Sequence, residues 1–371
     1  SDSFKGTVSS REICEIAQRV IPRHFPACEV VCIPVADGGE GTVDCFVQAM
    51  GAQRVGVTVT NALGEKSAAA YARLGELAII EMAAAAGLPQ VGALRCPGTA
   101  TTYGVGELIA HAVDSGCRKI LLGLGGSATN DGGCGCAAAL GVGFLDADGQ
   151  SFVPVGDTLG RIARIDTAEA EALLRSVEIT VMCDVTNPLY GPTGAAYVFA
   201  PQKGADAEKV KSLDAGLRHF GDVIRSQYGL DVSAMPGAGA AGGMGAGCVA
   251  LLGGTIQSGI DAVLDVTGFD RQLEGADLVI TGEGRIDSQS ADGKVVSGVA
   301  RRTRAKGVPL IAIAGGIADS AGAVYDIGVS AMFSTDRAAL PVDMLGARSP
   351  DDYEATLNDI MSLIAIAERF A

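Results

Sequence analysis

Short apolar runs alternate along this chain with amphipathic segments, and most of the apolar runs end in glycine and small polar residues. Residues 120–124 are such a run and predict a short buried strand. The glycine-rich stretch 125–133 follows, and the small residues up to 140 predict a helix. Glycines in such a turn let backbone N–H groups approach an anion closely. The segment is therefore either a phosphate-binding loop or an ordinary tight turn.

Similar strand, turn and helix patterns occur near both ends of the chain, for example at residues 30–35 and 278–281, and a different pattern lies between them. From residue 54 apolar and polar residues alternate strictly, with turn signals at 61–64 and 74–75, which predicts an antiparallel meander of about three strands. We therefore expect an α/β fold with two domains. Residues 1–51 and 254–371 would form a Rossmann-like, doubly wound sheet, and residues 52–253 an inserted mixed-sheet α/β domain with the meander.

The amino-acid composition and net charge limit which kinds of molecule the protein could bind. The 371 residues include 52 glycines without a repeat and no tryptophan, which suits a core of small aliphatic residues and many tight turns. The formal net charge of −15 disfavours binding to nucleic acids and to anionic membranes. No apolar run approaches the roughly 20 residues of a membrane span, and no signal peptide precedes the first amphipathic segment. We expect a cytoplasmic protein that acts on a small molecule.

Cysteine and histidine give little sign of chemistry. The ten cysteines include no CxxC pair and no zinc spacing, so we expect reduced, structural thiols. The three histidines have no cysteine or carboxylate at the spacing of a ligand or nucleophile pair. This argues against metal–histidine and Ser-His-Asp chemistry.

Acidic residues next to glycines follow several predicted strands, at Asp37, Asp131, Asp184 and Asp287. Loops at the carboxyl ends of strands in open α/β sheets converge on one cleft. Phosphoryl transfer needs backbone N–H groups for phosphates, carboxylates for Mg²⁺ and a cation for developing charge. The chain lacks a Walker A sequence, but these parts indicate a nucleotide-dependent kinase. Asp131 alone could be a helix cap, and Asp184 could start an Asx-type turn.

Two other functions have some support. Gly237, Gly239 and Gly242 match GxGxxG, which would suit an NAD-dependent oxidoreductase acting on a small hydroxy acid, although no clean strand precedes them. A solute-binding protein would also have two α/β lobes. Such proteins are normally exported, which the unpatterned cysteines disfavour.

Seven motifs, in order along the chain, resemble the bacterial type I glycerate kinase family. They are DSFKG (2–6), PVADGGEGT (34–42), GGSATNDGG (125–133), CDVTNPL (183–189), PQKGA (201–205), GAGAAGGMG (237–245) and TGEGRIDSQS (281–290). The resemblance implies an enzyme that phosphorylates D-glycerate with ATP and Mg²⁺, with its active site in a cleft between two α/β domains. It also implies a short apolar strand before residue 2, since family members begin with Met and such a strand.

The roles of individual residues are our hypotheses. Arg285 and Asp287 are two apart, so in an extended segment they face the same side, and an Arg can hold a carboxylate bidentately. We expect Arg285 to bind glycerate, Asp287 to orient its hydroxyl group, and Lys5 to contact the transferring phosphoryl group. The expected nucleotide-binding residues are Gly125, Gly126, Ser127, Thr129 and Asn130, and the expected magnesium ligands are Asp37 and Asp184.

Overall fold

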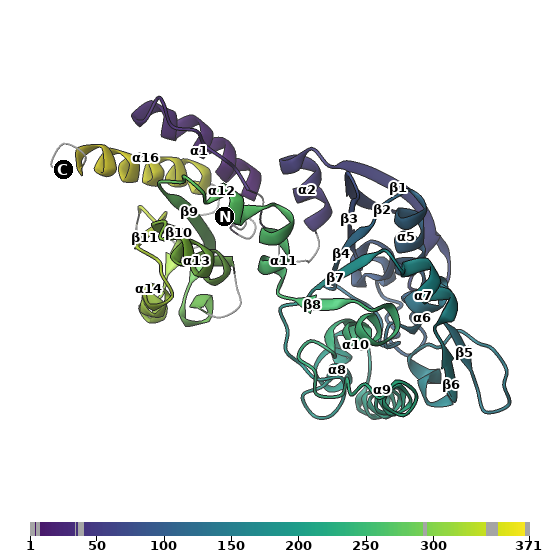
Figure 1. Ribbon diagram of the computed structural model, residues 1–371. Coiled ribbons are helices and arrows are strands. Elements are labelled where there is room, and N and C mark those ends of the chain that lie inside the picture. Colours follow the sequence, from purple (N-terminus) through teal and green to yellow (C-terminus); the bar gives the residue numbers. More distant parts are fainter. Residues whose placement is uncertain are drawn as a thin grey trace. The chain divides into compact units, whose positions relative to one another are not determined.

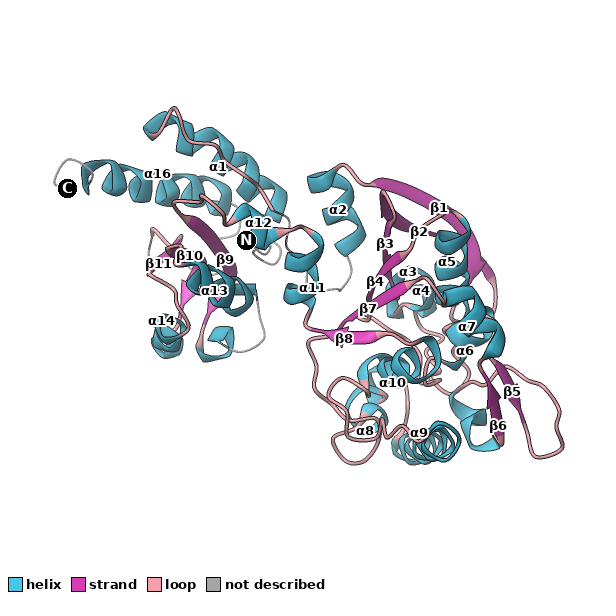
Figure 2. Cartoon of the chain, in the orientation of Figure 1, coloured by secondary structure: helices cyan, strands magenta, loops and turns pink. Residues whose placement is uncertain are grey.

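The computed structural model describes residues 4, 8–33, 35, 41–291, 295–338 and 348–367 of the chain (Figure 1). Helices and strands are mixed throughout this part, so the predicted α/β class is confirmed (Figure 2). Contacts divide the chain into two compact units. Unit 1 is Ser1–Ala36, Gln48–Met50 and Ile260–Ala371, and unit 2 is Asp37–Val47 and Gly51–Gly259. The domain boundaries expected from the sequence, and the doubly wound and inserted arrangement, stay predictions.

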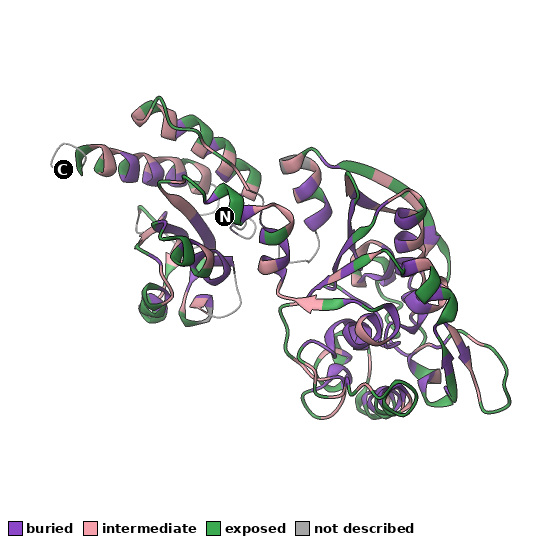
Figure 3. Ribbon diagram, in the orientation of Figure 1, coloured by how far each residue is buried: buried purple, intermediate pink, exposed green. Residues whose placement is uncertain are grey.

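Unit 2 contains a mixed sheet of six strands in the order β1-β2-β3-β4-β7-β8. The first three strands pair antiparallel, as the alternation predicts, and β3, β4, β7 and β8 pair in parallel. Every residue of β3 is buried, in keeping with a central strand (Figure 3). The strands are β1 (Gln53–Thr60), β2 (Lys66–Leu74), β3 (Leu77–Glu81), β4 (Lys119–Gly123), β7 (Glu178–Met182) and β8 (Thr255–Gln257).

Helices of unit 2 pack with this sheet into one apolar core, to which β3, β4, α5, α6, α9 and α10 all contribute. A small hairpin of β5 (Gly143–Leu145) and β6 (Arg164–Asp166) lies outside the main sheet. The helices are α2 (Thr42–Met50, which reaches into unit 1), α3 (Ala83–Ala86), α4 (Leu88–Val91), α5 (Tyr103–Asp114), α6 (Cys134–Ala139), α7 (Ala168–Leu174), α8 (Ala195–Phe199), α9 (Ala207–Tyr228) and α10 (Ala240–Leu252), with 3₁₀ turns η1 (Gly156–Arg161) and η2 (Pro201–Lys203).

Unit 1 contains a parallel sheet in the order β11-β10-β9, formed by β9 (Val279–Ile286), β10 (Leu310–Ile317) and β11 (Ala331–Ser334). Alternate residues of β10 point into two different cores, Leu310 and Ala312 into one and Ile311 and Ile313 into the other. The helices and 3₁₀ turns are α1 (Ser10–His24), α11 (Gly259–Val266, which starts in unit 2), α12 (Phe269–Gln272), α13 (Val295–Lys306), α14 (Ala323–Asp326), α16 (Ser349–Ala367), η3 (Ser288–Ala291) and η4 (Asp319–Gly322).

Local sequence signals set the ends of α1. The Ser9 hydroxyl accepts the Glu12 N–H at 3.2 Å and the Glu12 carboxylate accepts the Ser9 N–H at 2.8 Å, so the predicted capping box is confirmed. Helix α16 lies beside α1 (Figure 1), where Arg19 pairs with Glu354 and the Phe4 and Tyr353 rings meet edge to face at 5.7 Å.

One strand prediction was wrong. Residues 30–33 and 35, which belong to the strand expected at 30–35, are not in a strand. The strand expected at 278–281 is confirmed as part of β9, and it continues to Ile286 because Gly282 and Glu283 pair with β10. A side chain at Gly315 would lie 2.6 Å from the Gly284 carbonyl oxygen, so glycine permits this ladder. Within the described residues no helix combines the length and apolarity that a membrane span requires.

Candidate active site

The loops after β3, β4, β7 and β8 lie at one edge of the sheet in unit 2, because these four strands are parallel. Backbone bonds join neighbouring strand ends: Met82 N–H donates to Gly123 O at 2.9 Å, and Cys183 N–H donates to Gln257 O at 2.9 Å. The carboxyl edge of parallel strands is the usual ligand site in α/β folds. Ligands of unit 2 are therefore expected at this edge of the sheet.

Residues 124–133, which we call the glycine loop, connect β4 to α6 at this edge. Gly125 and Gly126 are exposed, whereas Ser127 is 7% exposed. Because glycine has no side chain, the exposed part of the loop is backbone. Two bonds fix it to the turn after β3: Ala128 N–H donates to Ala86 O at 2.9 Å, and Leu88 N–H donates to Gly126 O at 2.8 Å. The loop is thus a rigid turn whose exposed surface consists of glycine backbone.

Asp131 is a buried anchor of the glycine loop. Its carboxylate accepts the Thr102 N–H and hydroxyl, both at 2.8 Å, the Gly133 N–H at 3.1 Å and the Gly135 N–H at 3.3 Å. Burial raises the pKa of Asp131, while these hydrogen bonds act in the opposite direction. The contacts join the starts of α5 and α6, so Asp131 has a structural role, although the N-cap residue of α6 itself is Gly133.

The glycines at 237–247 pack against the glycine loop and do not open a dinucleotide site. Residues 231–236, directly before Gly237, form no strand, and the start of α10 is buried. Gly132 N–H donates to Gly242 O at 3.0 Å, and a side chain at Gly242 would lie 2.1 Å from the Thr129 carbonyl oxygen. Gly242 therefore serves close packing at φ +71°, a backbone conformation that favours glycine. This observation removes the basis of the oxidoreductase interpretation.

Lys203 lies beneath the glycine loop, and our sequence reasoning gave it no role. Its Nζ donates to the Ser127 hydroxyl at 2.8 Å and to Thr129 O at 2.7 Å, and the residue is 2% exposed. Burial lowers the pKa of Lys203 to about 7, and the negative charge of Asp131 opposes this shift. The sequence held one signal for such a role: Lys203 belongs to PQKGA (201–205), one of the seven motifs of the family resemblance.

Two further side chains of the loop retain unused hydrogen-bonding groups. Thr129 and Asn130 are fully buried, and in the described part of the chain no group bonds the Thr129 hydroxyl or either amide atom of Asn130. An unsatisfied buried group costs about 1–3 kcal/mol. Such groups are expected where water or a ligand completes the set in the working protein.

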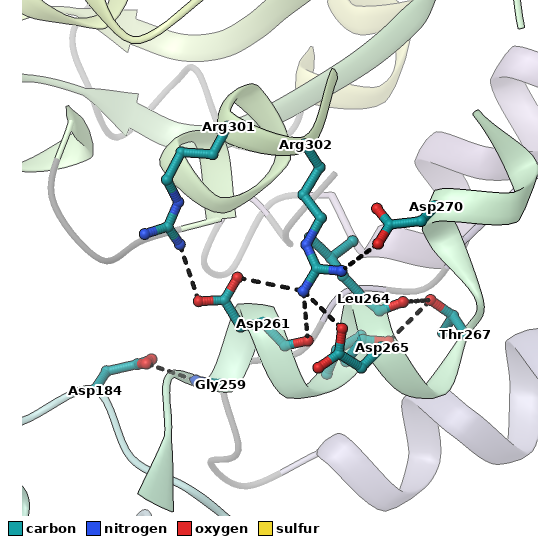
Figure 4. A network of polar contacts seen from close by, with 10 residues as sticks. Asp184, Gly259, Asp261, Leu264, Asp265, Thr267, Asp270, Arg301 and Arg302 are labelled. Carbon is teal, nitrogen blue, oxygen red and sulfur yellow. Dashed lines mark hydrogen bonds and ion pairs between the residues drawn. The ribbon is translucent and has the colours of Figure 1, made fainter. Parts of the chain in front are cut away.

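Asp184, one of the two expected magnesium ligands, is an exposed residue just after β7. Its Oδ1 accepts the Gly259 N–H at 2.7 Å, at the first residue of α11 (Figure 4). Asp37 and Lys5 lie outside the described residues. Within the described ranges no group of three or more His, Cys, Asp or Glu side chains is arranged to hold a metal ion. All ten cysteines are free thiols, as expected.

Arg285 and Asp287 belong to unit 1, whereas the glycine loop belongs to unit 2. Arg285 is exposed near the end of β9, and Asp287 is half-buried directly after this strand. The Asp287 N–H donates to Ser290 Oγ at 3.1 Å, which starts the turn into η3. Arg285 is within β9, whereas Asp287 lies at the bend that follows the strand, and their roles stay predictions.

Unit 1 also contains a network of ion pairs between α13 and the α11–α12 region (Figure 4). The Arg302 guanidinium contacts Asp265 at 2.7 Å, Asp270 at 2.9 Å and Asp261 at 3.5 Å. Arg301 pairs with Asp261 at 2.9 Å. Each charge has a partner here, so the network serves to hold the helices together.

Comparison with known proteins identifies the family. The model of the glycerate kinase family matches residues 1–365. The chain is 45% identical to the glycerate kinase of Bacillus cereus, over 99% of this chain and 97% of that protein. It is 42% identical to the glycerate 2-kinase of Escherichia coli, over 100% and 98%. A crystal structure of a protein described as glycerate kinase 2 from Salmonella typhimurium LT2 has a TM-score of 0.88 at 39% identity, covering 100% of this chain and 98% of that chain.

These findings confirm the resemblance and do not support the oxidoreductase alternative. A kinase of this family takes its phosphoryl group from a nucleotide. The chain belongs to the glycerate kinase family, and its activity is the phosphorylation of glycerate.

Proposed function

We propose that this chain transfers the terminal phosphoryl group of ATP to the 2-hydroxyl of D-glycerate, with Mg²⁺ as cofactor. The position of transfer is supported by the name of the Escherichia coli relative, a glycerate 2-kinase, which is 42% identical over the full chain. We also propose a cytoplasmic location, because ATP is available there and free thiols stay reduced there.

The main support for a nucleotide-binding site is the position of the glycine loop, at the carboxyl edge of the parallel strands in unit 2. Its exposed surface is the backbone of Gly125 and Gly126, which leaves room for phosphate oxygens beside N–H groups. The buried Asn130 amide has hydrogen-bonding capacity that no described residue uses. We assign the ATP phosphates to Gly125, Gly126 and Ser127, with Thr129 and Asn130 supporting the loop from inside.

Magnesium is assigned to Asp37 and Asp184. A carboxylate offers two oxygens and about four lone pairs, so the bond from Gly259 N–H orients Asp184 without using all of its acceptor capacity. Oxygen ligands of this kind suit Mg²⁺, which neutralises charge on the phosphates when bound. The protein would contribute the carboxylates of Asp37 and Asp184 as ligands.

Glycerate is assigned to residues outside the glycine loop. Arg285 would hold the glycerate carboxylate, Asp287 would orient the acceptor hydroxyl and accept its proton, and Lys5 would contact the transferring phosphoryl group. Arg285 is near the end of β9 in unit 1, and Asp287 is the first residue after this strand. We therefore propose a two-domain enzyme, with a doubly wound domain, an inserted domain and the reaction in the cleft between them.

Phosphorus NMR of the product tests the proposed reaction. Wild-type protein incubated with ATP, Mg²⁺ and D-glycerate should form ADP and 2-phosphoglycerate, and omission of D-glycerate should leave ATP intact. Formation of 3-phosphoglycerate would show that the proposed position is wrong. Absence of any phosphorylated glycerate would overturn the function itself.

Two substitutions test the glycerate residues. Asp287→Asn is nearly isosteric and should lower kcat by about 10²- to 10⁴-fold while the affinity for glycerate is kept, because a general base is lost. Arg285→Lys should raise KM for glycerate about tenfold or more and leave KM for ATP unchanged. Arg301→Lys, which alters an ion pair with Asp261 elsewhere in unit 1, is the matched control. Near-normal kinetics in both variants would refute these assignments.

A further inference from the structure

We propose that Lys203 is a positioning residue that fixes the Ser127 hydroxyl as a hydrogen-bond donor to a phosphate of the bound nucleotide. The inference rests on the proposed nucleotide site at the glycine loop. It adds a residue from η2, 76 positions along the chain from Ser127, and a mechanism by which that residue acts.

The contacts determine which atom donates. A lysine ammonium group has three donors and no acceptor, so Ser127 Oγ accepts the bond from Lys203 Nζ at 2.8 Å. The second bond of Nζ, to Thr129 O at 2.7 Å, holds the ammonium group under the backbone of the loop. The hydroxyl hydrogen of Ser127 must then point to another acceptor, and none is found for it among the described residues.

A phosphate oxygen is the acceptor that this arrangement suits. Ser127 is at the boundary between the exposed glycines and the buried half of the loop, at 7% exposure. Accepting a charge-assisted bond makes a hydroxyl a better donor, because hydrogen bonds in a chain polarise one another.

The groups around Lys203 leave its ammonium group to bond Ser127 and Thr129. No carboxylate of the described chain lies within 4.0 Å of Lys203 Nζ, and Asp131 is the acidic group whose charge acts on it. On the other side, the Arg95 guanidinium donates to the Gln202 carbonyl at 3.0 Å and adds positive charge near η2. Above its pKa, the neutral Lys203 amine could accept the Ser127 hydrogen instead, which would turn the hydroxyl away from a phosphate.

Binding of ATP, measured by calorimetry without glycerate, tests the proposal. Ser127→Ala should weaken ATP binding about 10- to 100-fold, the usual effect of losing a hydrogen bond to a charged group. Lys203→Met should weaken it to a similar extent. Because Lys203 acts through Ser127, the double variant should bind within about twofold of Ser127→Ala alone. Lys209→Met, which removes a surface lysine paired with Asp157 at 2.8 Å, is the control and should bind as wild type.

The pH dependence separates positioning from a packing role. The ratio of ATP affinities of wild type and Ser127→Ala should fall as pH rises through about 7, since Lys203 loses its proton there. The ionisation of ATP itself cancels in this ratio. This comparison needs no variant of Lys203, so it decides the matter even where Lys203→Met does not fold.

Two results would overturn the proposal: losses that multiply in the double variant, or an affinity ratio that does not change with pH. Neither result would bear on the phosphorylation of glycerate. A wild-type protein that binds ATP but forms no phosphoglycerate would instead reject the proposed function, while this binding test would still stand.

Discussion

Lys203 in unit 2 and Arg302 in unit 1 are both basic residues within polar networks, but their surroundings differ. Arg302 has three carboxylate partners, and among the causes of its raised pKa, hydrogen bonds and charges from Asp265 and Asp270 outweigh the opposing effect of burial. Lys203 has two neutral oxygen partners, and its burial lowers its pKa to about 7. The Arg302 guanidinium is paired with carboxylates, whereas the Lys203 amine bonds only neutral oxygens among the described residues.

The difference indicates which network is available for function. A cation surrounded by carboxylates presents little field to a ligand, and exposed pairs of this kind contribute little each to stability. A buried cation without a carboxylate partner is costly, and groups with strongly shifted pKa values are concentrated at functional sites. On this argument the network of Figure 4 is structural, and the one beneath the glycine loop is functional.

The largest effect on stability should come from the anchor of the glycine loop. Asp131→Asn would place an amide NH₂ group where a carboxylate oxygen accepts a backbone N–H, so a buried donor is left without a partner. We expect a loss of about 2 to 3 kcal/mol in the free energy of unfolding, measured with urea. Asp157→Asn, at an exposed pair, should lose less than about 1 kcal/mol. Equal losses would show that the anchor is no stronger than a surface pair.

Per pH unit, a smaller effect should appear as a dependence of stability on pH. The pKa of Lys203 is about 7 in the folded protein and has an ordinary value of 10.5, so between these values the unfolded chain binds more protons. Stability of the folded state should therefore rise with pH through this window, by at most about 1.4 kcal/mol per pH unit. The slope for wild type should exceed that for Lys203→Met. If the free energy of unfolding depended on pH equally in wild type and in Lys203→Met, Lys203 would have an ordinary pKa in the folded protein.

The smallest effect should come from the network in unit 1. Arg302→Met removes three partly exposed pairs, and we expect about 1 kcal/mol of stability to be lost. KM for ATP and for glycerate should both stay as in wild type. High salt should reduce the loss further, since screening weakens exposed pairs. A change in either KM would contradict the distinction between the two networks.

Features set by neighbouring residues could be predicted from the sequence. The capping box at Ser9 and Glu12, the antiparallel strands β1, β2 and β3, and the strand, glycine loop and helix around residue 125 all follow from local patterns. These elements depend on turn residues and periodicity, which a short window of sequence contains.

Features that depend on residues far apart in the chain could not be predicted. The bond from Lys203 to Thr129 spans 74 positions, and no local pattern records it. The glycines near Gly242 were considered as a cofactor fingerprint, yet they serve close packing on the glycine loop, which only the fold reveals. The extension of β9 to Ile286 likewise depends on its ladder with β10.

The central claim is that the glycine loop binds the nucleotide phosphates. A crystal structure of this protein with Mg²⁺, D-glycerate and a non-hydrolysable ATP analogue tests it most directly. We predict phosphate oxygens about 3 Å from the Ser127 hydroxyl and from backbone N–H groups of the exposed glycines Gly125 and Gly126. Phosphates bound elsewhere, with the glycine loop making no contact to the analogue, would contradict the account.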